Sequence, residues 1–265
     1  MLDKLEEYES IPEQETLHNI RVELKKIKTI FHLINFCSKN FNASKEYKPL
    51  NKIFREAGKI RKVYLTEKLF LEHRIKFVKE ATNINIENKL IYEFRQNISR
   101  YKNNIGKNYK SLEKNFYKVD INCYRKYLDI KKHKADITIY ADTDESELHE
   151  ARKIIKEIIY LSNISPSAKK NINPLYDEIQ NVIGRWHDKQ MLMKWLDKHY
   201  SASHDRDVEK LKSKCMIDLK EIKLMILKLY KKNRGFLSKH SIFIIIVTII
   251  SLHHSQFLSV VKNTC

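Results

Sequence analysis

Residues 17–28 read LHNIRVELKKIK, and residues 148–159 read LHEARKIIKEII. Both stretches begin with Leu-His, and both carry an Arg four positions and a Lys eight positions after the Leu, at a constant offset of 131 residues. Apolar residues recur three or four positions apart in each stretch, which is the spacing of an amphipathic helix. The two stretches therefore predict a pair of equivalent helices within an all-α protein.

A second repeated element follows each of these helices. A Pro-Leu pair is followed nine or ten positions later by Gly-x-x-Arg or Gly-x-x-His, namely Pro49, Gly58 and Arg61, then Pro174, Gly184 and His187. Two elements repeated in the same order predict an internal duplication that builds two pseudo-symmetric helical bundles within one domain. The first half is expected at about 10–134 and the second at about 142–240, while the apolar C-terminal segment 241–265 has no assigned role.

Composition supports helices and an anionic partner. Four glycines and four prolines in 265 residues are too few for the frequent turns of a β-sandwich or barrel. Lys and Arg number 51 against 33 Asp and Glu, a net charge of +18, which fits nucleic acid, an anionic membrane or polyphosphate. The apolar run 241–252 is shorter than the roughly 20 residues of a membrane span, so no transmembrane span is expected.

The cysteines and the first residues bear on localisation. Four cysteines form no Cys-x-x-Cys pair, which argues against structural zinc and favours a reducing compartment. The first residues are acidic and lack the apolar stretch of a signal peptide. These features predict a cytoplasmic protein, and a polyphosphate ligand would associate it with polyphosphate granules.

Breakers and caps predict the helix boundaries. Ser10, Pro12 and Glu13 resemble a capping box that starts a helix over 12–38. Residues 42–48 are expected to form a loop, and Pro49 is expected to open a helix that reaches residue 80. Residues 82–88 are expected to break the helical pattern, and Gly106 is expected to interrupt the helices that follow. An extended linker is expected over 135–144, and three further helices over 144–163, 174–200 and 205–232.

Each of the two equivalent helices carries a stripe of cations. At 100° per residue, the first stripe is about 80° wide and lies opposite the apolar face. It consists of His18, Arg21, Lys25, Lys28 and His32, and the second stripe holds His149, Arg152 and Lys156. Neither stripe contains an acid, whereas an ordinary exposed helix face alternates the signs of its charges. Such ladders of Arg, Lys and His suit an extended anion with regularly spaced phosphates.

A third basic region covers residues 89–134, which hold 13 Lys and Arg against 4 Asp and Glu. Exposed charges of this kind act mainly through long-range attraction, so we expect them to matter less for binding than the two stripes.

The two helices resemble the signature helices of the conserved-histidine α-helical domain (CHAD) family. In that family His-x-x-Arg-Val is followed by basic residues, then by Gly-x-x-Arg-Asp, and the whole pattern occurs twice. The matching residues are His18, Arg21, Val22, Lys25, Lys26 and Lys28, then His149, Arg152, Lys156 and Tyr160, with Gly58, Arg61, Gly184, His187 and Asp188 in the later elements. The chain departs from the pattern at Lys62, Ile159 and His187, which suggests weaker phosphate binding by the second half.

The resemblance implies two helical bundles around a basic channel or groove that binds inorganic polyphosphate. The expected ligands of polyphosphate are His18, Arg21, Lys25, Lys26, Lys28, Arg61, His149, Arg152, Lys156 and His187. No catalytic residue, metal or cofactor is expected.

Two alternatives remain open from the sequence. The aromatic residues interleaved with Lys in 89–134 would fit a nucleic-acid-binding helical protein, although no known nucleic-acid-binding motif is present. The His-Asp pairs at 187–188 and 204–205 would fit a metal-dependent phosphohydrolase of the HD type, although neighbouring cations would repel a divalent metal.

Overall fold

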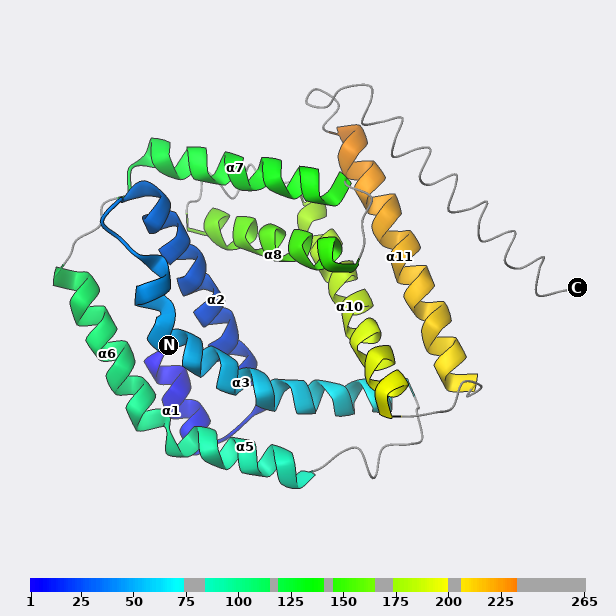
Figure 1. Ribbon diagram of the computed structural model, residues 1–265, viewed down its shortest axis with the longest axis horizontal. Helices are drawn as coiled ribbons and strands as arrows, with labels where there is room; N and C mark the ends of the chain where they lie inside the picture. Colours follow the sequence, from blue (N-terminus) through cyan, green and yellow to red (C-terminus); the bar gives the residue numbers. More distant parts are fainter. Residues whose placement is uncertain (74–83, 115–118, 141–144, 165–173, 200–205, 233–265) are drawn as a thin grey trace, which may run out of the picture.

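The computed structural model describes residues 1–73, 84–114, 119–140, 145–164, 174–199 and 206–232 (Figure 1). These residues form nine α-helices and no strand, so the all-α prediction is confirmed for the described part of the chain. The helices are α1 (Leu2–Ser10), α2 (Gln14–Cys37), α3 (Ala43–Glu72), α5 (Ile84–Gln96), α6 (Ile98–Lys114), α7 (Ile121–Tyr140), α8 (Glu145–Ser162), α10 (Leu175–His199) and α11 (Arg206–Lys232).

Within those residues, no helix has the length and hydropathy needed to cross a membrane. The apolar run 241–252 and the whole segment 241–265 lie outside the described residues.

One hydrophobic core lies among α1, α2, α3, α5 and α6. The apolar face predicted for residues 17–28 enters this core, since Leu17, Ile20 and Leu24 are fully buried. They pack with Ile53 and Ile60 of α3, which are also fully buried. Burying this face of α2 leaves its opposite, basic side free to line a cavity.

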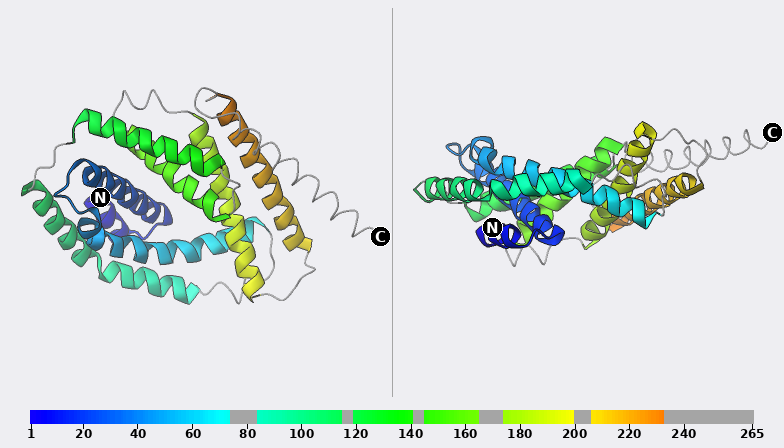
Figure 2. Two further views of the ribbon diagram at one scale, coloured as in Figure 1. Left: turned by 45° about the horizontal axis from the view of Figure 1, so that its top comes forward. Right: turned by 90° about the horizontal axis from the view of Figure 1, so that it is seen from below.

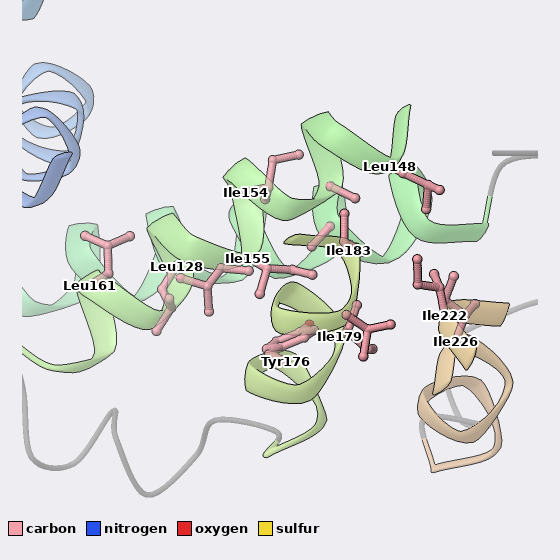
Figure 3. Packing of buried hydrophobic residues seen from close by; sticks show 14 of the residues in the cluster. Leu128, Leu148, Ile154, Ile155, Leu161, Tyr176, Ile179, Ile183, Ile222 and Ile226 are labelled. Carbon is pink, nitrogen blue, oxygen red and sulfur yellow. The ribbon is translucent and has the colours of Figure 1, made fainter. Parts of the chain in front are cut away.

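A second core lies among α7, α8, α10 and α11. Figure 3 shows Ile154 and Ile155 of α8 between Leu128 of α7 and Ile183 of α10, with Ile222 of α11 at the edge. Helices α7 and α8 run side by side in Figures 1 and 2. Residues 121–134, which the sequence assigned to the first half, therefore pack with the second core.

A small third cluster joins the end of α3 to α10 and α11. Phe70, near the end of α3, is fully buried against Leu192 and Leu196 of α10 and Leu211 of α11. Its ring meets the Trp195 ring edge-on at 5.0 Å between centroids. The end of α3 thus crosses α10 (Figure 1), and the flattened body in Figure 2 places α2, α3, α8 and α10 toward its middle.

Two predicted helix signals near the N-terminus are wrong, the cap at Ser10 and the helix start at Pro49. The helix predicted over 12–38 agrees with α2 within two residues, but Ser10 does not cap it. Ser10 instead ends α1, where its hydroxyl donates to the Glu6 carbonyl. Residues 43–48 are helical because the Asn42 side chain accepts from the Lys45 amide at 3.0 Å and caps α3. Pro49 consequently lies inside α3, where it removes one backbone hydrogen bond without ending the helix.

The predicted interruptions in the middle of the chain are also misplaced. Helix α5 already begins at Ile84, and Asn97 separates it from α6. Gly106 lies within α6, and residues 135–140 belong to α7 rather than to an extended linker. The predictions for 144–163, 174–200 and 205–232 agree with α8, α10 and α11 within two residues.

A disulfide joins the C-terminal end of α2 to α7. The Sγ atoms of Cys37 and Cys123 lie 2.10 Å apart and close a separation of 86 residues. This bond disagrees with the reducing compartment that the cysteine pattern suggested, because such compartments keep most thiols reduced. Cys215 is buried in the second core as a free thiol.

Candidate functional site: a cationic cavity between α2, α3 and α8

The basic sides of α2 and α8 face one cavity of 380 Å³, closed on a third side by α3. We call it the cationic cavity. It is lined by Arg21, Lys25, Lys28, Thr29, Tyr47, Asn51, Phe54, His149, Arg152, Lys153, Lys156, Glu157 and Tyr160. Six of these residues are cations and one is a carboxylate, so the wall carries a strong positive charge.

Arg21 is held against α3 by three contacts. Its Nη1 donates to the Phe54 carbonyl at 2.5 Å, and the guanidinium carbon lies 4.1 Å from the centroid of the Phe54 ring. The guanidinium also lies over Gly58, where a Cβ would come within 2.5 Å of Nη1. Burial and the neighbouring Arg61 lower the pKa of Arg21, which shows how crowded with positive charge this position is.

Arg152 is held against α10 in the same manner. Its Nε donates to the Gln180 carbonyl at 3.1 Å, and its guanidinium lies over Gly184, where a Cβ would come within 2.9 Å of Nη2. Burial lowers the pKa of Arg152, and the nearby Asp188 carboxylate partly opposes this shift.

Lysines from both stripes approach each other across the cavity. Burial lowers the pKa of Lys25 to about 8, and the charges of Lys156, Arg21 and Arg152 add to this effect. Burial also lowers the pKa of Lys156, together with the charge of Arg152. Lys28 lies over the Tyr47 ring, with Nζ 5.7 Å from its centroid. Within the described chain, no carboxylate lies within 4.0 Å of these three ammonium groups.

One carboxylate, Glu157, departs from the acid-free pattern expected for this site. It accepts from Lys131 of α7 at 2.5 Å, and its other oxygen lies 3.6 Å from Nδ1 of His32. His32 and the Lys131 ammonium keep the pKa of Glu157 below its usual value in spite of its burial. The sequence missed Glu157 because it lies about 80° from His149 around the helix, outside the stripe but still on the cavity wall.

A second cavity of 230 Å³ adjoins the first at Arg21. Arg61 and Lys62 of α3 line it together with Asp188 of α10. His18 lines neither cavity, and burial and then the Arg61 charge lower its pKa. The second cavity therefore extends the positive wall toward the crossing of α3 and α10, with Asp188 as its carboxylate.

His149 and His187 form a pair of stacked rings, with centroids 4.5 Å apart and planes 30° apart. Burial lowers the pKa of His149, and His187 adds to the shift. The Nδ1 atom of His149 is buried and has no hydrogen-bond partner among the described residues. His187 thus lies behind His149 and lines neither of the two cavities.

The structure brings seven of the ten sequence-predicted site residues to the two cavities, whereas His18, Lys26 and His187 line neither of them. Arg21, Lys25, Lys28, His149, Arg152 and Lys156 line the cationic cavity, and Arg61 lines the adjoining one. Lys26 lies on another side of α2, where its Nζ binds Glu23 at 2.9 Å, so the structure separates it from the site. Sequence reasoning missed Tyr47, Asn51 and Phe54, whose i, i+4 and i+7 spacing on α3 was the available signal.

The described residues do not supply a metal site. No group of three or more His, Cys, Asp or Glu side chains among them is placed to hold a metal ion. Asp188 and His187 therefore belong to the basic surroundings of Arg152 rather than to such a group, and the second His-Asp pair, 204–205, lies outside the described residues.

Comparisons with family models, with curated proteins and with solved structures find no match to this chain.

Proposed function

We propose that this protein binds inorganic polyphosphate in the cationic cavity and catalyses no reaction. The observation that carries the proposal is the meeting of cations from two distant segments of the chain. Arg21, Lys25 and Lys28 of α2 face Arg152 and Lys156 of α8 without a carboxylate within 4.0 Å of any of them among the described residues. Buried like charges repel each other, and a bound chain of phosphates would replace this repulsion with attraction.

The surroundings of Lys25 fit an anionic ligand, because burial and then the charges of Lys156, Arg21 and Arg152 lower its pKa. Its ammonium group is both buried and close to other cations, and a bound anion would offset the unfavourable free energy of both. Arginine presents a planar fork to phosphate oxygens, and both arginines have already fixed one N–H on a backbone carbonyl. The remaining N–H groups are oriented before the ligand arrives, which reduces the entropy lost on binding.

The paired arginine contacts support an internal duplication and a place in the CHAD family. Arg21 and Arg152 each donate to a carbonyl four residues before a glycine, and each covers that glycine. The carbonyls of Phe54 and Gln180 are separated by 126 residues, as are Gly58 and Gly184. A contact repeated at the spacing of the sequence repeat is what a duplicated helical unit would produce.

Nucleic acid is disfavoured by the way the cavity uses its aromatic rings. Proteins that bind single strands stack bases on free aromatic faces. Here Phe54 carries Arg21 at 4.1 Å and Lys25 at 5.9 Å, and Tyr47 carries Lys28 at 5.7 Å. These rings hold cations through cation–π contacts, so they serve the positive wall rather than a stack of bases.

A competition assay tests the proposal. Fluorescently labelled long-chain polyphosphate would be bound to the full chain at near-physiological salt and then challenged with single-stranded RNA, duplex DNA and ATP. Unlabelled polyphosphate is expected to displace the label at the lowest phosphate concentration. Displacement by RNA or DNA at a lower phosphate concentration would replace this proposal with nucleic-acid binding, because salt dependence alone cannot separate the two polyanions.

We propose that the protein associates with polyphosphate granules in the cytoplasm, because polyphosphate is the ligand that the cationic cavity fits. This placement requires the Cys37–Cys123 disulfide to persist in a reducing compartment. Co-localisation of the tagged full chain with a polyphosphate stain tests this placement. Loss of the overlap when cellular polyphosphate is degraded is the expected result, and overlap that persists without polyphosphate would contradict it.

A further inference from the structure

Two glycines lie where the two cavity arginines meet neighbouring helices. Gly58 lies within α3 and Gly184 within α10, and both positions are helical, where glycine is intrinsically unfavourable. A Cβ at Gly58 would lie 2.5 Å from Nη1 and 3.4 Å from Cζ of Arg21. A Cβ at Gly184 would lie 2.9 Å from Nη2 and 3.2 Å from Nε of Arg152. In both cases the three nearest atoms belong to the guanidinium alone.

We infer that Gly58 and Gly184 are positioning residues, each a seat that lets one guanidinium lie flat on a helix and face the cationic cavity. The inference rests on the proposed function, because it concerns how the same site is assembled. Each seat works with a backbone carbonyl one helical turn earlier, Phe54 for Arg21 and Gln180 for Arg152. The carbonyl fixes one N–H, and the missing side chain gives the rest of the guanidinium its room.

Packing between helices alone would not require a glycine at either position. The groups above the glycines are the far ends of long, flexible side chains, so a methyl group there would displace the arginine rather than the helix backbone. The helix would keep its fold and the cavity would keep its charge. Only the direction in which the guanidinium presents its N–H groups would change.

Gly106 offers a matched control on α6. It also lies within a helix, and a Cβ at this position would meet nothing within 4 Å. Gly106→Ala therefore reports the general effect of replacing a helical glycine, which is a small stabilisation.

The test is a double-mutant cycle that pairs each glycine with its arginine. Gly58→Ala is expected to weaken binding of long-chain polyphosphate about 10- to 100-fold, the contribution of one charge-assisted hydrogen bond, with a melting temperature close to that of the wild type. In an Arg21→Ala background the same change is expected to have no further effect on binding, because the displaced group is already absent. The second cycle, of Gly184→Ala and Arg152→Ala, is expected to give the same pattern. Gly106→Ala is expected to leave binding unchanged.

The outcomes separate the seat from the proposed function. If the wild type does not bind polyphosphate, the proposed function fails. If the wild type binds and Gly58→Ala and Gly184→Ala bind equally well, the seats are refuted while the function stands. Equal losses of binding in the presence and absence of Arg21, or a fall in melting temperature in both backgrounds, would show that Gly58 serves helix packing and would overturn the inference.

Discussion

Removing the two seated arginines together is the most informative perturbation of the cationic cavity. Arg21→Ala with Arg152→Ala deletes one guanidinium from each of the two repeated segments and leaves both hydrophobic cores intact, because neither side chain belongs to a core. The change does remove two hydrogen bonds, to the carbonyls of Phe54 and Gln180. Because neither hydrophobic core loses a side chain, circular dichroism is expected to show unchanged helix content.

The magnitude follows from the contacts that remain for a ligand. An arginine has five N–H donors. Arg21 and Arg152 each use one donor on a backbone carbonyl, so about four remain on each arginine to face an anion. A charge-assisted hydrogen bond contributes about 1.5–3 kcal/mol. One such bond from each arginine gives a loss of about 3–6 kcal/mol, which corresponds to a fall in affinity of about 10²- to 10⁴-fold.

The assay is a titration of labelled long-chain polyphosphate at fixed salt, compared with a control that removes the same charge elsewhere. Arg100→Ala with Arg125→Ala is the matched control, because both arginines are exposed, on α6 and α7, and line none of the described cavities. The control is expected to lose only a few-fold in affinity through weaker long-range attraction. Equal losses in the two double variants would refute the reasoning and leave total charge as the only determinant.

Three further predictions concern Lys25, Lys26 and the Cys37–Cys123 disulfide. Polyphosphate favours the charged form of Lys25, whose pKa is about 8 in the free protein, so its affinity is expected to fall as the pH rises above about 8. Lys25→Met is expected to flatten this pH profile in binding titrations. Lys26→Ala is expected to leave affinity within about twofold of the wild type, since Lys26 binds Glu23 outside the cavity; a loss like that of Lys25→Ala would contradict the assignment. Cys123→Ser is expected to lower the free energy of unfolding by about 4–5 kcal/mol in denaturant titrations, because it removes a disulfide that closes 86 residues. Cys215→Ser keeps this disulfide, so its stability is expected to remain as sensitive to reductant as that of the wild type.

Local patterns predicted the helices whose signals lie within them. The buried face of α2 followed from the spacing of Leu17, Ile20 and Leu24, and the boundaries of α8, α10 and α11 followed from caps and breakers. The same reasoning failed at Pro49, because a proline can start a helix or lie within one, and the Asn42 cap decided between them. It failed at Gly106 because a glycine interrupts a helix only when its surroundings do not hold the helix together.

The sequence by itself determined that the chain is helical and that two of its helices carry a basic side without acids. Both properties depend on residues three and four positions apart, and that spacing is visible in the chain. Only the tertiary structure decided that these sides meet across one cavity, that α3 closes it with Phe54 and Tyr47, and that Glu157 enters its wall while Lys26 leaves it. These outcomes depend on which helices bury their apolar faces against each other, and this choice brings together residues more than a hundred positions apart.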